Sequence, residues 1–275
     1  MREWYNRTQL KQVSTHLTQA SNAILPTRKG YINSIAEASF KAIQQYDVKL
    51  PNQNVKKPTS FKKAGNSEQP QWFQAEIKEK DGMLNFQTWQ RLDQSTITPD
   101  IRTKALRCHH LYDIKRDLSA KNRVVVNGSK QHSDTYTDTT SPVAGQMMVR
   151  LFLTITAYRK WDMIQLDLTN AYLHAPIQDI VYIIIPEGFP GAGEIALLQK
   201  AAYGTKQGAR RFYDFTVQVL KQIGQTTCPN DPCLFRYLCD GSVCFLLQYV
   251  DDALIAGDPT AIASLQKEMK KILTM

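Results

Sequence analysis

Two adjacent aspartates, Asp251 and Asp252, stand inside the run FLLQYVDDALIAG, between two apolar segments of strand-like composition. Carboxylates are costly to bring into apolar surroundings unless a partner compensates their charge. A hairpin would place both acids at its tip, where a purely structural turn would favour Asn-Gly or Asp-Gly. A divalent cation resolves this conflict, because Mg²⁺ takes hard oxygen ligands from one or two carboxylates together with substrate phosphates.

A third carboxylate is then expected on a neighbouring strand. Asp167 ends the apolar run MIQLD, in the same kind of setting. Three carboxylates on two adjacent strand ends would suit two metal ions roughly 3.5–4 Å apart, one for an attacking oxygen and one for a leaving group. The pattern alone leaves a second interpretation open, a pair of acids at a solvated turn, because Asp is common in turns.

Other residues with ligand chemistry give weaker signals. Four of the five cysteines fall between 228 and 244, at spacings unlike the tight pairs of a zinc ribbon or finger. Their apolar neighbours favour ordinary buried thiols, and an odd number does not suit a disulfide framework. The run CHH at 108–110 lacks a nearby partner cluster, which disfavours a metal site there.

The carboxylates need strands to hold them, and the sequence predicts an α+β fold, an antiparallel sheet with helices packed on one face. Apolar runs predict strands at 110–115, 123–126, 162–168 and 181–189, and three more within 233–257, two of them joined at CDGS. Periodic apolar positions predict helices at 72–80, ending before Gly82, and at 206–224, ending at Gly224. Another helix is expected over 258–275.

One further helix has a clear start signal. Thr140 or Ser141 can cap it, and Pro142 suits its first turn. An apolar stripe then recurs at i, i+3, i+4 and i+7, which predicts a face buried in the core. The stripe consists of Ala144, Met147, Met148, Leu151, Phe152 and Ile155.

Charge is concentrated at the start of the chain. The 275 residues are 43% hydrophobic and carry a net charge of +9, and residues 1–70 hold eleven Lys or Arg against four Asp or Glu. We interpret 1–70 as a basic polar linker, with one short helix near 34–46, and 71–275 as one domain. Either a polyanionic partner such as nucleic acid or a solvated tail explains the excess. No apolar run approaches the roughly 20 residues that span a membrane, so a soluble intracellular protein is expected.

Seven motifs occur in an order that resembles the reverse transcriptases of copia-type long-terminal-repeat retrotransposons. They are WFQAEI, KNRVVV, SPVAGQMMVR, LDLTNAYL, PEGF, YGTKQGARRFY and YVDDALIAG, and together they cover about residues 72–275. The resemblance implies a fingers and palm fold and RNA-directed DNA polymerase activity, with two Mg²⁺ ions, or Mn²⁺ instead. It also implies a primed RNA or DNA template, dNTPs and the rest of a Pol polyprotein as partners, no membrane, and a location in cytoplasmic particles or the nucleus.

The resemblance implies roles for individual residues. Asp167, Asp251 and Asp252 would be the catalytic metal ligands, and the backbone carbonyl of Leu168 would complete a coordination sphere. Arg123, with Lys121, would hold the incoming triphosphate, since a planar guanidinium binds phosphate oxygens in pairs. The other implied positions are Tyr172 as a gate against the ribose 2′-OH, Gln207 beside the nascent base pair, Gly204 and Gly208 where the backbone approaches closely, and Tyr249 near the primer end.

Some features depart from the family pattern. Asn127 stands where a basic residue is common, and Gly208 where Ala-Pro is common. The family continues into a thumb after the YVDD hairpin, whereas this sequence stops within a helical pattern, which suggests truncation. Two alternatives therefore remain, a catalytically inactive remnant that at most binds nucleic acid, and a two-metal nuclease, which would leave Tyr172 without a role.

Overall fold

The computed structural model describes residues 57–65, 70–115 and 119–273. It divides into two compact units that differ in their sheets. The antiparallel unit contains described residues 142–169 and 217–273, and the mixed unit contains those of 57–141 and 170–216. The helix predicted near 34–46 lies outside the described residues.

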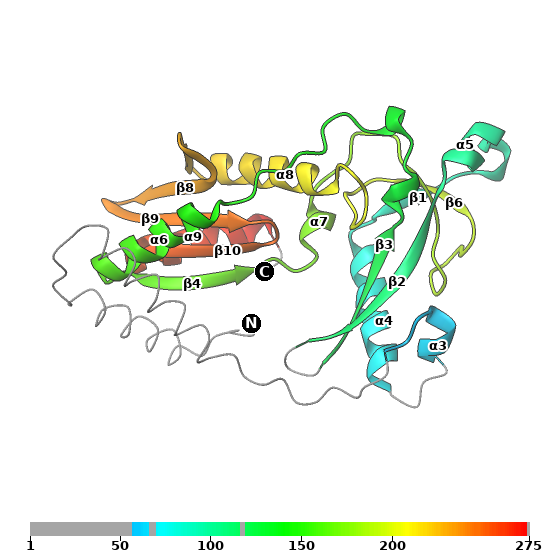
Figure 1. Cartoon of the computed structure of the whole chain (residues 1–275), viewed down its shortest axis with the longest axis horizontal. Helices are drawn as coiled ribbons and strands as arrows, with labels where there is room; N and C mark the ends of the chain where they lie inside the picture. The colour runs from blue at the N-terminus through cyan, green and yellow to red at the C-terminus, as the bar shows by residue number, and fades with distance from the viewer. Residues whose placement is uncertain (1–56, 66–69, 116–118, 274–275) are drawn as a thin grey trace. The chain divides into compact units, whose positions relative to one another are not determined.

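The antiparallel unit is built on a five-stranded sheet in the order β4-β10-β9-β8-β7, in which every neighbouring pair is antiparallel (Figure 1). The CDGS hairpin is confirmed, with Asp240 and Gly241 at φ 49° and 78°, as a tight two-residue turn requires. The strands are β4 (Asp162–Asp167), β7 (Thr226–Cys228), β8 (Asp231–Cys239), β9 (Ser242–Tyr249) and β10 (Asp252–Gly257).

Helix α9 (Pro259–Ile272) packs on β8, β9 and β10 (Figure 1). Its buried residues are Ala261, Ile262, Leu265 and Met269, which recur at helical spacing. The hydroxyl group of Tyr237 on β8 lies 3.1 Å from Ser264 Oγ on this helix. The prediction of a final helix on one face of an antiparallel sheet is therefore confirmed.

The helix predicted from Thr140 or Ser141 begins later than expected. Helix α6 spans Gln146–Arg159, and its N-cap position is Gly145, which has no side chain to cap with. Instead, Arg210 Nη1 donates to the carbonyl oxygen of Thr140 at 3.2 Å. A long-range contact thus holds the segment that the local start signal assigned to the helix.

The apolar stripe of α6 is also only partly a core face. Ala144 and Phe152 are buried, but the stripe is otherwise exposed or half-buried, and Met147 is 76% exposed. Helical spacing shows which residues share a face, but burial depends on whether another element covers that face. The prediction of a wholly buried stripe was wrong.

The mixed unit has a second five-stranded sheet, in the order β1-β6-β5-β2-β3. Neighbours are antiparallel except β2 and β5, which are parallel. The predicted hairpin is confirmed as β2–β3, with Leu111 opposite Arg123. The strands are β1 (Trp89–Arg91), β2 (Leu106–Ile114), β3 (Ala120–Val126), β5 (Tyr182–Ile184) and β6 (Ile195–Leu198).

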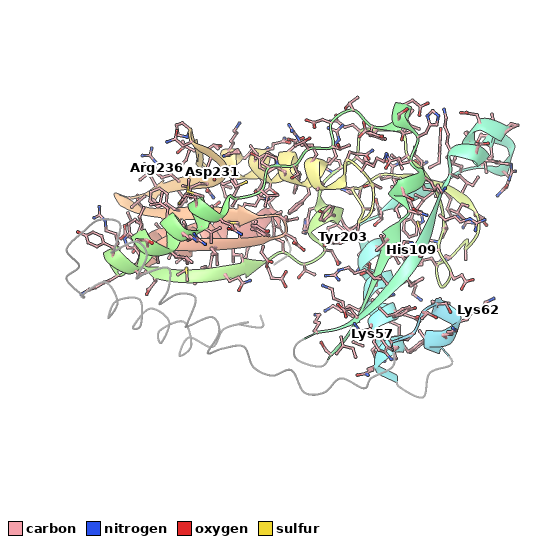
Figure 2. The ribbon with its side chains drawn as sticks, viewed as in Figure 1. Lys57, Lys62, His109, Tyr203, Asp231 and Arg236 are labelled. Atoms are coloured by element: carbon pink, nitrogen blue, oxygen red, sulfur yellow. The ribbon has the colours of Figure 1, made fainter. Side chains whose placement is uncertain are left out.

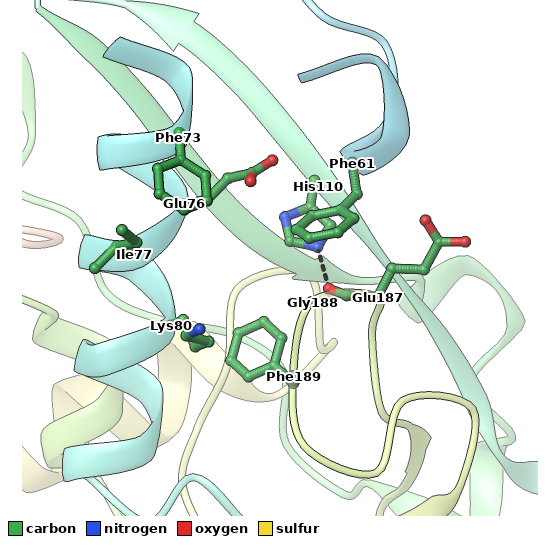
Figure 3. Close-up of a pocket in the computed structure, with 9 residues that line it drawn as sticks. All are labelled: Phe61, Phe73, Glu76, Ile77, Lys80, His110, Glu187, Gly188 and Phe189. Atoms are coloured by element: carbon green, nitrogen blue, oxygen red, sulfur yellow. Dashed lines mark hydrogen bonds between the residues drawn. The ribbon is translucent and has the colours of Figure 1, made fainter. Parts of the chain in front are cut away.

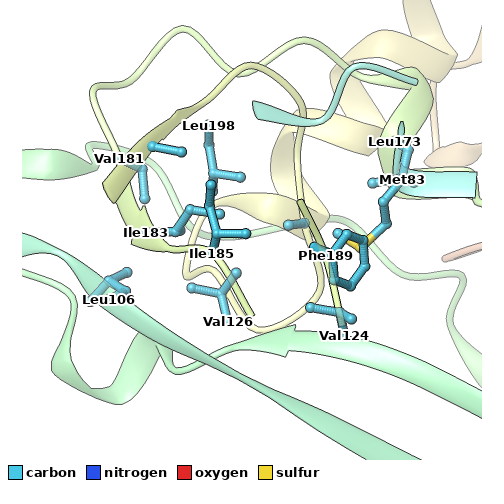
Figure 4. Packing of buried hydrophobic residues seen from close by; sticks show 12 residues of the cluster. Met83, Leu106, Val124, Val126, Leu173, Val181, Ile183, Ile185, Phe189 and Leu198 are labelled. Carbon is cyan, nitrogen blue, oxygen red and sulfur yellow. The ribbon is translucent and has the colours of Figure 1, made fainter. Parts of the chain in front are cut away.

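One apolar cluster fills the core of this unit, as Figure 4 shows. It joins residues from the strands to Met83 of α4 and Phe189, so that the sheet and the helix share a buried face. Close packing of this kind supplies most of the favourable free energy of folding. The cluster consists of Met83, Leu106, Val124, Val126, Leu173, Val181, Ile183, Ile185, Phe189, Ala196, Leu198 and Ala202.

Helix α4 (Pro70–Asn85) is longer than predicted, because it continues through Gly82. A Cβ atom at Gly82 would lie 2.5 Å from Nδ2 of Asn170. The glycine therefore makes room for a neighbouring side chain and does not break the helix. The end predicted at Lys80 was wrong.

The segment predicted as a linker contains structure near its end. Helix α3 (Phe61–Gly65) places Ala64 in a small buried cluster with Trp72, Tyr112 and Ile114. The other helices are α5 (Pro99–Lys104), α7 (Ala171–His174) and α8 (Gly208–Gln222), with 3₁₀ turns at Gln94–Thr96, Gly128–Lys130 and Ser133–Thr135. Within the described part of the chain, no helix combines the length and the apolar character needed to cross a membrane.

Candidate active site

Three residues singled out from the sequence lie in one row across neighbouring strands. Asp252 is paired with Asp167 on β4 and with Tyr249 on β9, because β10 lies between those strands. All three residues stand at strand ends and are exposed. The structure thus places Asp167 and Asp252 opposite each other, and Asp251 lies one residue away in the turn.

We call the row of Asp167, Asp252 and Tyr249 the carboxylate row, after its two acids. It lies on the face of the sheet opposite α9. Tyr237 faces α9, as its contact with Ser264 shows. Successive side chains of a strand point to opposite faces, so the register can be followed from Tyr237 through β9 to β10 and β4. That alternation directs the row away from the covered face.

A strained two-residue turn holds Asp251. β9 ends at Tyr249 and β10 begins at Asp252, so Val250 and Asp251 form the turn. Val250 has a φ of 55°, a left-handed conformation that a branched residue rarely adopts. The buried Gln248 donates through Nε2 to the carbonyl oxygen of Val250 at 3.2 Å and so supports the turn. Strain of this kind costs about 1–3 kcal/mol and clusters at functional sites.

The row places two like charges at facing positions, which destabilises a sheet unless something offsets them. Gln165 Nε2 donates a hydrogen bond to Asp252 Oδ1 at 3.3 Å. Carboxylate oxygens are the hard donors that Mg²⁺ prefers, so the donor set fits such an ion. Leu168, whose carbonyl the resemblance adds to the ligands, directly follows β4 and has a buried side chain.

The side chains themselves are not gathered into a ligand set. Among the residues that the structure describes, no group of three His, Cys, Asp or Glu side chains is close enough to hold a metal ion. The register of the backbone, and not an assembled cluster, therefore supports the prediction for Asp167, Asp251 and Asp252.

Lys121 and Arg123, the predicted triphosphate ligands, alternate with buried residues on β3, and both are half-buried. β3 is an edge strand, and α4 packs against it. Glu79 of α4 accepts a hydrogen bond from the backbone N–H of Val124 at 2.8 Å. The helix thus supplies an acceptor for one N–H group of this edge strand. Burial raises the pKa of Glu79, while that hydrogen bond and the charges of Arg123 and Lys121 lower it. The two basic residues therefore share one acidic neighbour.

Tyr172, the predicted sugar gate, is buried in α7 between two aromatic rings. Its ring centroid lies 4.3 Å from that of Tyr203 and 5.5 Å from that of Phe212. Arg123 Cζ lies 5.8 Å from the centroid of Tyr203, which is labelled in Figure 2. Tyr203 thus joins two predicted site residues. Tyr203 was not among the predicted site residues, although its place in YGTKQ was a signal.

Gln207 is fully buried, and protein groups hold its amide. Its Oε1 accepts from Gln131 at 2.8 Å, and its Nε2 donates to the carbonyl oxygen of Thr135 at 3.1 Å and to Asp179 at 3.3 Å. Arg211 binds the same Asp179 carboxylate at 3.0 Å. Contact of Gln207 with a base pair stays a prediction, since this network already engages both ends of the amide.

The predicted close backbone approaches occur between segments of the protein. Gly204 has a φ of 89°, and a Cβ atom there would overlap the carbonyl oxygen of Val126. The N–H of Val126 donates to the carbonyl oxygen of Tyr203 at 2.8 Å, so the YGTKQ segment is fastened to the end of β3. At Gly208 a Cβ atom would lie 2.8 Å from the carbonyl oxygen of Ala202. Template contact by either glycine stays a prediction.

The metal interpretation of CHH finds no support. Both ring nitrogens of His110 are engaged, Nε2 with the carbonyl oxygen of Glu187 at 3.0 Å and Nδ1 with Asn122 Nδ2 at 2.9 Å. Figure 3 shows the first contact beside a cavity of about 40 Å³, which Phe61, Glu76 and other residues line. A space of this size has room for a few water molecules at most. Burial raises the pKa of Cys108 to about 12.

The cysteines between 228 and 244 behave as ordinary thiols. No disulfide joins any of the five cysteines. Cys233 and Cys244 are buried, and burial raises their pKa to about 11 and about 12. Buried thiols of this kind are inert, as the apolar neighbours predicted.

Comparison with known proteins gives one family match and several relatives. A family model described as "Reverse transcriptase (RNA-dependent DNA polymerase)" matches residues 86–275. The chain is 31% identical, over 62% of its length, to the "Retrovirus-related Pol polyprotein from transposon TNT 1-94" of Nicotiana tabacum. It is 29% identical, over 78% of its length, to that from transposon RE2 of Arabidopsis thaliana. The "Transposon Ty1-JR1 Gag-Pol polyprotein" of Saccharomyces cerevisiae is 27% identical over 68% of the chain.

These relatives are much longer proteins. The matched part covers 14% of the tobacco relative, 16% of the Arabidopsis relative and 11% of the yeast relative. The family match includes every strand and site residue described above except Glu79.

Proposed function

This chain belongs to the reverse transcriptase (RNA-dependent DNA polymerase) family, and we propose that it is the nucleotidyl-transfer core of a copia-type RNA-directed DNA polymerase. The observation that carries the proposal is the carboxylate row, in which Asp167 and Asp252 face each other beside the strained turn of Asp251. A two-residue turn by itself accounts for the positive φ at Val250, but a solvated structural turn would not require the facing acids.

In this reaction a primer 3′-hydroxyl group attacks the α-phosphorus of a dNTP, and pyrophosphate leaves. Asp167, Asp251, Asp252 and the carbonyl of Leu168 would hold two Mg²⁺ ions, which stabilise charge on the attacking and leaving oxygens. The chain itself contributes positioning, because the sheet register fixes the backbone of Asp167 and Asp252 at facing positions before the reaction begins. Tyr249, exposed beside Asp252, is assigned to the primer end.

The mixed unit is assigned to the incoming nucleotide. Arg123 and Lys121 are half-buried cations on a strand edge, and a guanidinium group can bind two phosphate oxygens at once. Tyr172 would exclude the 2′-hydroxyl group of an rNTP, with its ring fixed by two aromatic neighbours. On this proposal the antiparallel unit is the palm and the mixed unit belongs to the fingers.

Primer extension tests the assignment. The full chain should incorporate dTTP on an oligo(dT) primer annealed to poly(rA) in the presence of Mg²⁺, and Asp251→Asn or Asp252→Asn should lower kcat by at least about 100-fold. Asp162→Asn is the matched control, since it removes the same charge from the exposed opposite end of β4. That control should retain the wild-type rate.

Equal rates for Asp252→Asn and Asp162→Asn would refute the site. A wild-type chain that binds primer–template but extends it with neither Mg²⁺ nor Mn²⁺ would refute the polymerase function. Binding without synthesis would leave the remnant alternative, in which basic residues hold nucleic acid through counterion release.

A further inference from the structure

A continuous chain of contacts joins the strand of Arg123 to the helix of Tyr172. The Arg123 guanidinium lies over the Tyr203 ring, whose centroid is 4.3 Å from that of Tyr172. Tyr172 is in turn nearly parallel to Phe212, with an interplanar angle of 17°. All four residues belong to the mixed unit. Cation–aromatic and aromatic–aromatic contacts at these distances are attractive.

The backbone of Tyr203 is fixed by the same strand that carries Arg123. Val126 donates to the Tyr203 carbonyl oxygen at 2.8 Å, and Gly204 packs directly against the carbonyl of Val126. The Tyr203 ring is half-buried, so it is partly ordered by its neighbours and partly shielded from water. The position of Tyr203 between Arg123 and Tyr172 therefore rests on both backbone and side-chain contacts.

We propose that Tyr203 is a positioning residue, which sets the guanidinium of Arg123 and the ring of Tyr172 relative to each other. This inference rests on the proposed function, in which Arg123 binds the triphosphate and Tyr172 meets the sugar of the same dNTP. Through Tyr203, the site that holds the phosphates is coupled to the site that discriminates deoxyribose from ribose. Tyr203 itself touches neither part of the nucleotide in this proposal.

The coupling predicts a specific kinetic pattern for Tyr203→Leu, which removes the ring. Loss of the cation–aromatic contact should raise KM for dTTP about two- to fivefold, with a smaller change in kcat. A shifted Tyr172 should also reduce the preference for dTTP over UTP, by about two- to tenfold. Tyr203→Phe keeps the ring and should behave as the wild type.

The matched control is Tyr136→Leu. Lys206 Nζ lies 4.7 Å from the centroid of the Tyr136 ring, so this variant also removes a half-buried tyrosine that pairs with a cation in the mixed unit. It should leave KM and the dTTP to UTP preference unchanged. Tyr203→Met, a flexible apolar replacement, serves if circular dichroism shows that Tyr203→Leu does not fold.

Each variant of the full chain is measured in two ways. Primer extension gives kcat and KM, and equilibrium binding of dTTP and UTP to a dideoxy-terminated primer–template complex gives Kd without chemistry. Unchanged Kd and unchanged preference in Tyr203→Leu would overturn the inference, as would equal losses in Tyr203→Phe or Tyr136→Leu.

The two assays separate this inference from the proposed function. A wild-type chain that binds dTTP without extending the primer overturns the polymerase function, while the Kd values still decide the role of Tyr203. A wild-type chain that neither binds dTTP nor extends the primer overturns both.

Discussion

The contact between the YGTKQ segment and β3 predicts that Gly204→Ala is strongly destabilising. Two effects combine at this position. The φ of 89° is unfavourable for any residue with a Cβ atom, and the added methyl group would overlap the carbonyl oxygen of Val126 and crowd Val125. Since neither neighbour is the flexible end of a long side chain, the backbone itself must move.

Two other glycines of the mixed unit separate these effects. Gly193 has a nearly identical φ of 87° with nothing within 4 Å of a Cβ atom, so Gly193→Ala should cost only about 1–2 kcal/mol for the backbone conformation. Gly128 does not have a positive φ, but a Cβ atom there would overlap the carbonyl oxygen of Gly204, so Gly128→Ala should cost about 1–3 kcal/mol through overpacking. Gly204→Ala carries both penalties, about 2–5 kcal/mol in all.

Urea unfolding followed by circular dichroism measures these differences, as shifts of the midpoint at constant slope. The expected order of stability is wild type, then Gly193→Ala, then Gly204→Ala, with Gly128→Ala clearly below the wild type. If Gly204→Ala were no less stable than Gly193→Ala, the close packing of the YGTKQ segment on β3 would be wrong. The placement of Tyr203 beside Arg123 would then lose its backbone support.

Two further predictions concern charged groups of the mixed unit. Burial raises the pKa of Glu79 in the folded state, so protonation stabilises the wild type below the unfolded pKa, and this stabilisation is lost as pH rises through the folded pKa. The free energy of unfolding of Glu79→Gln, relative to wild type, should therefore increase as the pH rises above the ordinary pKa of a glutamate, about 4.3, and a constant difference would contradict this. Asp179→Asn should cost about 1–3 kcal/mol in urea unfolding, because the mostly buried Arg211 loses its charged partner. Asp214→Asn, at the more exposed pair with Arg210, should cost less than about 1 kcal/mol, and equal losses would refute the distinction.

Much of the antiparallel sheet could be predicted because its signals are local. The Asp240-Gly241 turn and the apolar alternation of the strands around it depend on neighbouring residues alone. The same holds for the end of α8, where Gly224 takes a φ of 83° after the last turn. These predictions are confirmed.

The predictions that failed concern positions where a distant residue decides the local structure. Gly82 reads as a helix break, yet it faces Asn170, and the helix continues. Thr140 reads as a helix cap, yet Arg210 holds its carbonyl oxygen. Tyr203 and Glu79 escaped notice for the same reason, since their partners lie far away in the chain.

By itself, the sequence determined which groups are present and their order: two adjacent acids between apolar strands, a third at the end of an earlier strand, and the motifs of a family. The tertiary structure decided that β10 lies between β4 and β9, so that Asp252 faces Asp167, and that one tyrosine ring joins Arg123 to Tyr172. The physical reason is how far apart along the chain the deciding residues lie. Side-chain chemistry and turn conformation are set by a few consecutive residues, whereas strand order and ring contacts depend on packing free energy summed over segments far apart in the chain.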